Sequence, residues 1–364
     1  MRSRTVSRSL GVMVLGVLML SGCSGASLLE DLPDVDRGLV GVLMPTKDDH
    51  WEKDGVIIAE QLRLLGYRPE LVNAENDAQT QKTQLEGIIG KNPRALVIGA
   101  VDGTVLAAPL DAAGAKDIPV ISFDRLIRGS AHVDYYAAYD NAKVGTLQAE
   151  YLIDTLGLAA GKGPFTIELF AGSPNDNNAT YFFKGAMAGL RPYLASGKLV
   201  VVSKETAFSQ VAIPGWKGED ARARMAKLLT AHYAGRRVDA VLSPNDGLAR
   251  GIIQALGDAG YGKPSRPYPA ITGQDAQLDS VKLIAKGIQG HTIDKDMREL
   301  AKVAVQMVNS VLTGGTPEVN DTTQYHNGAK VVPTFLLAPV SVTKANYQRI
   351  LVDGGVFSAE QIRS

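Results

Sequence analysis

Short apolar segments alternate along this chain with longer segments in which apolar residues recur at helical spacing. Each apolar segment is continuous instead of alternating with polar residues, which is typical of strands buried on both faces of a parallel sheet. In the first half we expect strands at residues 39–44, 68–73, 95–100, 119–123 and 135–139. We expect helices between them, one ending at residue 65 and others at residues 78–91 and 104–116. This alternation predicts a series of β-α-β units and therefore a parallel sheet.

The same pattern begins again in the second half, with a helix at residues 142–156. Strands are expected at residues 165–170, 199–203, 238–243 and 270–272, and helices at residues 178–195, 219–233 and 246–259. The chain of 364 residues also exceeds the roughly 250–300 residues that one hydrophobic core usually supports. The prediction is an α/β protein of two Rossmann-like lobes, each with a parallel sheet.

Polar residues follow the predicted strands. In open parallel sheets, ligands bind beyond the carboxyl ends of the strands, so these loops are candidate binding segments. They are residues 45–51, 124–125, 172–178, 244–246, 273–275 and 294–296. Both tryptophans, Trp51 and Trp216, also fall in loops, where each either packs over an apolar edge or offers a flat face to a ligand. Flat apolar faces beside carboxylates, amides and cations are what a pyranose requires, because its C–H faces stack and its hydroxyls both donate and accept.

The first residues have the features of a bacterial lipoprotein signal. Arg2, Arg4 and Arg8 precede an apolar segment at residues 10–20, which ends in small residues before Cys23. The apolar segment is too short for the ~20 residues of a membrane-spanning helix. We therefore predict removal of residues 1–22, lipidation of Cys23 and a tether over residues 23–38. The expected location is the cell envelope, either anchored to the outer face of the cytoplasmic membrane or in the periplasm.

Composition narrows the class of protein. The 38 basic residues balance the 38 acidic ones, and removing the signal leaves a net negative chain, so nothing indicates nucleic-acid binding. Cys23 is the one cysteine, so the 45% of hydrophobic residues must build the core without an internal disulfide. The five histidines show no metal-ligand spacing. Nucleophile-elbow, zincin and dinucleotide motifs are absent from the sequence, and residues 157–163 miss the phosphate-loop spacing. We expect no cofactor, no metal and no enzymatic activity.

One enzymatic alternative is a glycosidase. Its carboxylate pair would come from the loop acids, which are Asp124, Asp176, Asp246 and Asp275. Each lies beside an amide or a guanidinium in the sequence, which favours hydrogen bonding to an intact sugar over proton transfer. A sugar-responsive transcription regulator would need an amino-terminal helix-turn-helix, where this chain has its signal.

Several stretches occur in the order found in one family of binding proteins. They are residues 44–47, 122–127, 172–179, 242–244, 273–276 and 330–333. Over these stretches the chain resembles the periplasmic sugar-binding proteins of ABC transporters, in the ribose/xylose/galactose branch of the type I fold. The resemblance implies two lobes joined by a three-strand hinge. The first lobe would hold residues 39–140 and 296–328, and the second would hold residues 141–295 and 329–364.

The resemblance also implies a sugar site between the lobes. Trp51 and Trp216 would sandwich the sugar, and Asp124 and Arg125 would bind one edge. Further contacts would come from the second lobe and the hinge. The expected ligand-binding residues are Lys47, His50, Trp51, Asp124, Arg125, Asn177, Asn178, Trp216, Asn245, Asp275 and Lys295. The ligand class is an aldose such as xylose, glucose or galactose.

The sequence leaves the roles of three residues open. Relatives generally carry an arginine before the first tryptophan, whereas this chain has His50, which either contributes to sugar preference or is a solvated residue at the rim. Asp140 and Asn141 either contact the ligand or cap the helix that follows them.

The expected partners are an ABC permease and its ATPase, which would recognise the sugar-closed form. The alternative is a sensing role, in which the protein reports sugar occupancy to a chemoreceptor or a sensor kinase. Both roles need the same cleft and the same closure, so the sequence leaves them open.

Overall fold

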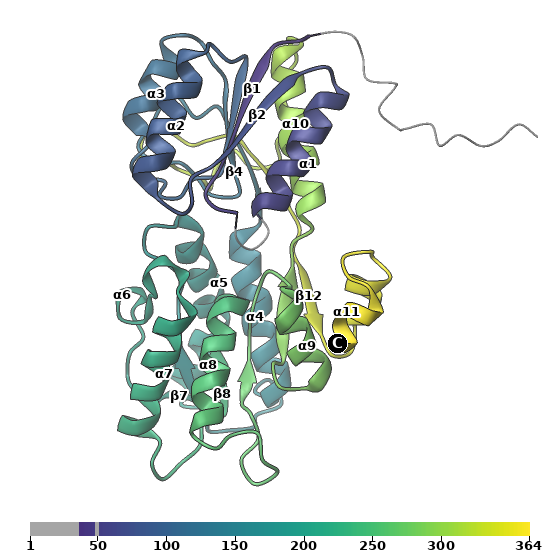
Figure 1. The fold of residues 1–364 in the computed structure, drawn as a ribbon. Helices are drawn as coiled ribbons and strands as arrows, with labels where there is room; N and C mark the ends of the chain where they lie inside the picture. The colour runs from purple at the N-terminus through teal and green to yellow at the C-terminus, as the bar shows by residue number, and fades with distance from the viewer. Residues whose placement is uncertain (1–35, 48–50) are drawn as a thin grey trace, which may run out of the picture.

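The computed structural model describes residues 36–47 and 51–364. The predicted signal, the lipidation of Cys23 and the role of His50 fall outside the described residues, as does most of the tether. Figure 1 shows two lobes stacked end to end, with the first half of the chain mostly in one lobe and the second half mostly in the other. Within the part that the structure describes, no helix is long and apolar enough to span a membrane.

The first lobe is built on a six-stranded parallel sheet of order β11-β5-β4-β3-β1-β2. Its strands are β1 (Leu39–Met44), β2 (Arg68–Asn73), β3 (Ala95–Ile98), β4 (Val120–Phe123), β5 (Tyr135–Tyr139) and β11 (Thr334–Leu337). Its helices are α1 (Trp51–Leu64), α2 (Ala78–Gly90), α3 (Ala107–Gly114) and α10 (Met297–Leu312). Strand β1 sends Val42 to the core beneath α1 and α10 and Leu43 to the core beneath α2 and α3. The sheet is therefore buried on both faces, as the continuous apolar segments predict.

The second lobe has a four-stranded parallel sheet of order β7-β6-β8-β9. Its strands are β6 (Phe165–Leu169), β7 (Leu199–Val201), β8 (Ala240–Leu242) and β9 (Ala270–Ile271). Its helices are α4 (Asn141–Leu156), α5 (Asn177–Ala195), α6 (Phe208–Val211), α7 (Gly218–His232), α8 (Asp246–Asp258) and α9 (Leu278–Lys286). Helix α4 packs on α5 over one face, and α7 packs on α8 over the other. The α/β class and the two parallel sheets are confirmed.

The chain passes between the lobes at three places. It leaves the first lobe after β5, returns after β10 (His291–Asp294), and leaves again between β11 and β12 (Val340–Thr343). Strands β10 and β12 pair antiparallel beside the second sheet. The boundary expected at residue 329 is wrong for residues 334–337, because β11 pairs with β5 at the edge of the first sheet. A short apolar strand has the same local pattern in either sheet, so its lobe depends on which strand edge it meets.

Helix ends place side chains at the junction of the lobes. The Asp140 side chain accepts from the backbone N–H of Lys143 at 2.9 Å, so it caps α4, one of the two roles left open for it. The last segment of the chain, with η2 (Gln348–Val352) and α11 (Ala359–Arg363), packs against α9 as a small separate core. Helices α9 and α11 and strands β11 and β12 were not predicted from the sequence.

Candidate functional site

A cavity lies between the lobes, at the carboxyl ends of strands from both sheets. Its lining residues are Trp51, Asp124, Arg125, Asp176, Asn178, Phe182, Trp216, Asn245, Gln274, Asp275, Gln277 and Lys295. The cavity volume is about 70 Å³. Since one water occupies roughly 10–15 Å³ on this measure, the cavity has room for roughly five to seven waters. That space suits one small polar molecule.

The two tryptophans enter this cavity from opposite lobes. Trp51 is the first residue of α1 and contacts Phe123 edge to face, with ring centroids 6.4 Å apart, while the Arg125 guanidinium lies 5.1 Å from its ring centroid. Trp216 ends the short turn η1 (Pro214–Trp216) and contacts Phe182 edge to face, also at 6.4 Å. Each tryptophan therefore packs against its own lobe and also lines the cavity.

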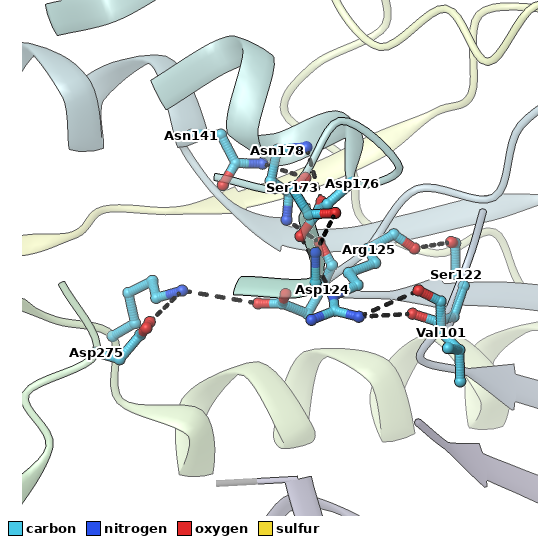
Figure 2. Close-up of polar contacts among 12 residues, drawn as sticks. Val101, Ser122, Asp124, Arg125, Asn141, Ser173, Asp176, Asn178 and Asp275 are labelled. Atoms are coloured by element: carbon cyan, nitrogen blue, oxygen red, sulfur yellow. Dashed lines mark hydrogen bonds and ion pairs between the residues drawn. The ribbon is translucent and has the colours of Figure 1, made fainter. Parts of the chain in front are cut away.

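Lys295 links carboxylates from the two lobes. Its Nζ lies 2.9 Å from Asp275 Oδ1, which follows β9, and 4.0 Å from Asp124 Oδ2, which follows β4. The lysine side chain is only 7% exposed. Burial alone would lower the pKa of Lys295, but Asp275 and Asp124 outweigh it and raise that pKa above its ordinary value. Lys295 is therefore a charged group held between two acids, Asp275 and Asp124, both of which are labelled in Figure 2.

A second ion pair joins Arg125 to Asp176, with 3.3 Å between Nε and Oδ2. Arg125 also donates from Nη1 to the Ala100 carbonyl oxygen at 3.1 Å, which fixes the plane of the guanidinium. Burial raises the pKa of Asp176, and Arg125 opposes that rise. Asp176 also caps α5, because its Oδ1 accepts from the Asn178 backbone N–H at 2.9 Å. The helix N-terminus and the arginine thus hold one carboxylate in place.

Buried amides hold the backbone of Asp124. Its carbonyl oxygen accepts from Tyr136 Oη at 2.5 Å and from Asn178 Nδ2 at 2.8 Å, and Asn141 Nδ2 donates to Asn178 Oδ1 at 3.0 Å. Figure 2 shows Asn141, Asn178 and Asp124 linked in this order. Asp124 and Asp275 both have positive φ, at 58° and 89°, which is uncommon outside glycine. Such strained backbone persists where the surroundings over-determine it, and it is concentrated at binding sites.

Two lining residues carry polar atoms that are buried and have no hydrogen-bond partner among the residues the structure describes. They are the N–H of the Trp216 indole and Oε1 of Gln274. One is a donor and the other an acceptor, and orphaned buried polar atoms in a native structure call for an explanation. A hydroxylated ligand supplies both kinds of partner, because each hydroxyl donates and accepts.

Asp246 lies behind the lining and is fully buried. It accepts from the Gln277 backbone N–H at 2.9 Å, from Gln289 Nε2 at 2.8 Å and from Thr292 Oγ1 at 2.9 Å. Burial, and then the charge of Asp275, raises the pKa of Asp246 to about 7. Asp246 thus ties the start of α8 to the hinge strand β10 and to the loop that carries Asp275.

The structure brings most of the expected site residues together. Eight line this one cavity: Trp51, Asp124, Arg125, Asn178, Trp216, Asn245, Asp275 and Lys295. Lys47 does not join them, because its side chain is 57% exposed and pairs with Glu75 at 3.3 Å. Asn177 starts α5 outside the lining. His50 falls outside the described residues.

The lining also includes residues that the expected set lacks, namely Asp176, Phe182, Gln274 and Gln277. Asp176 and Gln274 follow predicted strands, so their position at strand ends was a usable signal. Phe182 lies inside α5 and Gln277 precedes α9, where the sequence gives no sign of a binding site. Among the described residues, no group of three or more His, Cys, Asp or Glu side chains is arranged to hold a metal ion.

Comparisons with known proteins bear on this site. The family model for the periplasmic binding protein domain matches residues 40–316. The multiple sugar-binding periplasmic protein SbpA of Azospirillum brasilense is 48% identical over 362 residues, covering 99% of this chain and 100% of that protein. The multiple sugar-binding periplasmic receptor ChvE of Rhizobium radiobacter is 50% identical over 329 residues, covering 90% and 93%. An ABC transporter solute-binding protein of Clostridium phytofermentans, solved with bound β-D-glucose, superposes with a TM-score of 0.85 at 44% identity, covering 89% and 99%.

Proposed function

This chain belongs to the periplasmic binding protein family, and we propose that it captures an aldose between its two lobes and delivers it to an ABC permease. Multiple-sugar-binding relatives match nearly the whole chain, and a solved structure of the same fold holds a sugar. Those relatives are binding proteins rather than enzymes. The location that follows from the periplasmic relatives is the periplasm or cell envelope.

The observation that carries the proposal is the composition of the cavity between the lobes. Trp51 and Trp216 supply two aromatic faces, on which the C–H faces of a sugar ring stack. Paired carboxylates and cations around them supply acceptors and donors for the ring hydroxyls. Each lining acid lies beside a lining cation, Asp124 and Asp275 beside Lys295 and Asp176 beside Arg125, which favours an uncharged, hydroxylated ligand.

Individual roles follow from these positions. Asp124 and Asp275 accept hydrogen bonds from sugar hydroxyls, while Arg125 and Lys295 donate to them. Asn245 caps α8 through Oδ1, which accepts from the Leu248 backbone N–H at 3.0 Å, so its amide N–H groups are the ones that face a ligand. Asn178 acts indirectly, because both ends of its amide already hold the Asp124 backbone and Asn141.

Binding is coupled to closure of the lobes. Lys295 contacts one acid from each lobe, and the two tryptophans also come from different lobes. A sugar held between them stabilises the closed arrangement relative to an open one, because only the closed arrangement contacts it from both sides. The permease and its ATPase are the partners that read this closure.

The amino-terminal residues extend the proposal. Residues 1–22 serve as a lipoprotein signal and are removed, Cys23 is lipidated, and residues 23–38 tether the lobes to the membrane. The tether keeps the protein near its permease in the envelope. Mass spectrometry of the membrane-extracted protein tests this proposal, since a diacylated Cys23 at the new N-terminus is the expected species.

A second candidate function is sensing. It is favoured by the relative ChvE, which is named a receptor. Deletion of the gene separates the two functions. Lost aldose uptake supports transport, whereas unchanged uptake with lost sugar-dependent signalling supports sensing.

Calorimetric titration tests the sugar site. The protein starting after Cys23 is unfolded and refolded to remove carried ligand, then titrated with D-xylose, D-glucose, D-galactose, L-arabinose and D-ribose. We expect saturable binding of one or more of these aldoses at micromolar or tighter affinity. A folded protein that binds none of them would overturn the proposed ligand class.

A further inference from the structure

Gly172 lies directly against the indole of Trp216. It follows β6, and its φ is not in the left-handed region, where a side chain would be strained. A Cβ added at Gly172 would lie 1.9 Å from Cη2, 2.3 Å from Cζ2 and 2.4 Å from Cζ3 of Trp216. All three nearest atoms belong to this one ring. The space that glycine leaves at position 172 is therefore occupied by the tryptophan.

The backbones on either side of this contact are fastened to each other. Ala171 accepts from the Ile213 backbone N–H at 3.0 Å, and Ser173 Oγ accepts from the Gly215 backbone N–H at 3.1 Å. Trp216 itself has φ of 58°, a conformation that a bulky residue adopts only when its surroundings impose it. A methyl group at position 172 would therefore have to be accommodated by movement of the indole rather than of the chain.

The size and direction of that movement follow from the contacts. An ordinary contact begins at 3.4 Å, so the ring would have to move by about 1.5 Å from its present 1.9 Å separation. Phe182 lies against the edge of the indole within the second lobe, while Trp216 lines both the cavity and the more open space beside it between the lobes. The ring would move toward this space between the lobes, where the proposed ligand binds.

We propose that Gly172 is a positioning residue for the sugar site, which sets the depth of the Trp216 ring and thereby the space between the two stacking faces. The proposal rests on the proposed function and identifies a further residue that determines the shape of the same site. Gly99 stands in a similar, looser relation to Trp51, since a Cβ there would lie 2.8 Å from Cζ3. The first lobe thus repeats the arrangement with a smaller clash.

Replacement of Gly172 by alanine tests the proposal. Overpacking of this kind is unfavourable, so Gly172→Ala should bind every aldose that the wild type binds about tenfold or more weakly. Gly99→Ala should have a smaller effect in the same direction. The control is Gly189→Ala, which overpacks α4 against α5 at 2.9 Å from the Ala149 Cβ without touching a tryptophan. Its affinity should stay within about twofold of the wild type even where its melting temperature falls.

A double-mutant cycle shows whether Gly172 acts through the indole. Trp216→Phe shortens the side chain by the outer part of the indole, which carries all three clashing atoms, but keeps an aromatic face. In that background Gly172→Ala should cause no further loss of affinity, because the collision partner is gone. An equal loss in both backgrounds would refute the positioning role.

A measurement without sugar separates this inference from the proposed function. The chain has two tryptophans, so Trp51→Phe leaves Trp216 as the only indole. Adding Gly172→Ala should shift the emission of Trp216 and change its quenching by acrylamide, while Gly189→Ala should change neither. Unchanged fluorescence would overturn the inference even if sugars bind, and a clear shift in a protein that binds no aldose would leave the packing inference standing while the proposed function fails.

Discussion

Replacement of Lys295 by methionine should weaken sugar binding more than any change at an exposed charge. Lys295 Nζ lies 2.9 Å from Asp275 and 4.0 Å from Asp124, and the lysine side chain is 7% exposed. Methionine fills much of the same volume without the charge, so the packing is largely kept. The change leaves two buried carboxylates from different lobes facing each other without a cation.

The magnitude follows from that arrangement. Truncating one partner of a buried, hydrogen-bonded charge pair costs about 2–5 kcal/mol, mainly because the other charge remains buried without a partner. Since about 1.4 kcal/mol is a factor of ten, the affinity for the preferred aldose should fall by roughly 30-fold or more. Part of that loss comes from repulsion between Asp124 and Asp275, which opposes closure of the lobes.

The dependence on pH gives a second readout. In Lys295→Met, two neighbouring carboxylates raise the pKa of one of them, so lowering the pH protonates that one and removes the repulsion. Affinity of the variant should therefore improve as the pH falls from about 7.5 to about 5. In the wild type the acids raise the pKa of Lys295, which stays protonated throughout this range and gives no such improvement.

Calorimetry at both pH values, with circular dichroism to confirm folding, is the assay. The matched control is Lys302→Met on α10, where the lysine is 51% exposed and pairs with Glu299 at 2.6 Å. Exposed pairs contribute about 0–1 kcal/mol, so the control should bind sugar like the wild type. Wild-type affinity of Lys295→Met at pH 7.5 would refute the assignment of this ion pair to the sugar site.

Three further predictions concern other parts of the site. Trp216→Ala should weaken aldose binding by about 1–3 kcal/mol with little change in melting temperature. Trp51→Ala should lower both the affinity and the melting temperature, because Trp51 is 4% exposed within the first-lobe core. Calorimetry and thermal melts distinguish the two variants, and equal melting temperatures would contradict this prediction. Burial raises the pKa of Asp246 to about 7 from an unfolded value of about 3.9. The folded state therefore binds one more proton than the unfolded state, and the stability that this group contributes at acid pH is lost as the pH rises through 7. Asp246→Asn should flatten the dependence of the free energy of urea unfolding on pH between about 4 and 7. An unchanged slope would exclude Asp246 as the source of that pH dependence. His50→Arg, which introduces the residue that the resemblance implies at this position, should alter the ranking of aldoses in the titration panel, and an identical ranking would make His50 a bystander.

Much of the fold was predictable because its signals are local. Strands β1, β2 and β5 have the expected bounds. β1 and β5 are continuous apolar or aromatic segments, whereas β2 carries Arg68 and Glu70 because it lies at the edge of the sheet. Residues 334–337 were misplaced, because a strand at the edge of a sheet carries no mark of which lobe it joins. Helix α9 was not predicted, although its apolar residues Leu278, Val281 and Ile284 recur three apart, a spacing that places them on one helix face.

The residues of the site were predictable to a similar extent as the fold. Asp124, Asp275 and Lys295 each follow a strand, which marked their loops as candidate binding segments. Their strands belong to three separate sheets, and it was the resemblance that implied their meeting between the lobes. Phe182 reaches the lining from within a helix, and its role has no local signal. Lys47 also follows a strand, since β1 ends at Met44, yet its side chain is exposed and paired with Glu75, because the direction of a side chain in a loop depends on its neighbours in space.

The sequence by itself determined the α/β class, the two lobes and the chemistry available at the strand ends, because these depend on local periodicity and on residue type. Only the tertiary structure decided how that chemistry is used. It placed Lys295 between acids that lie far apart in the chain, and it set the Trp216 ring against Gly172. Both are relations between distant residues, and they exist only once the lobes have packed and met.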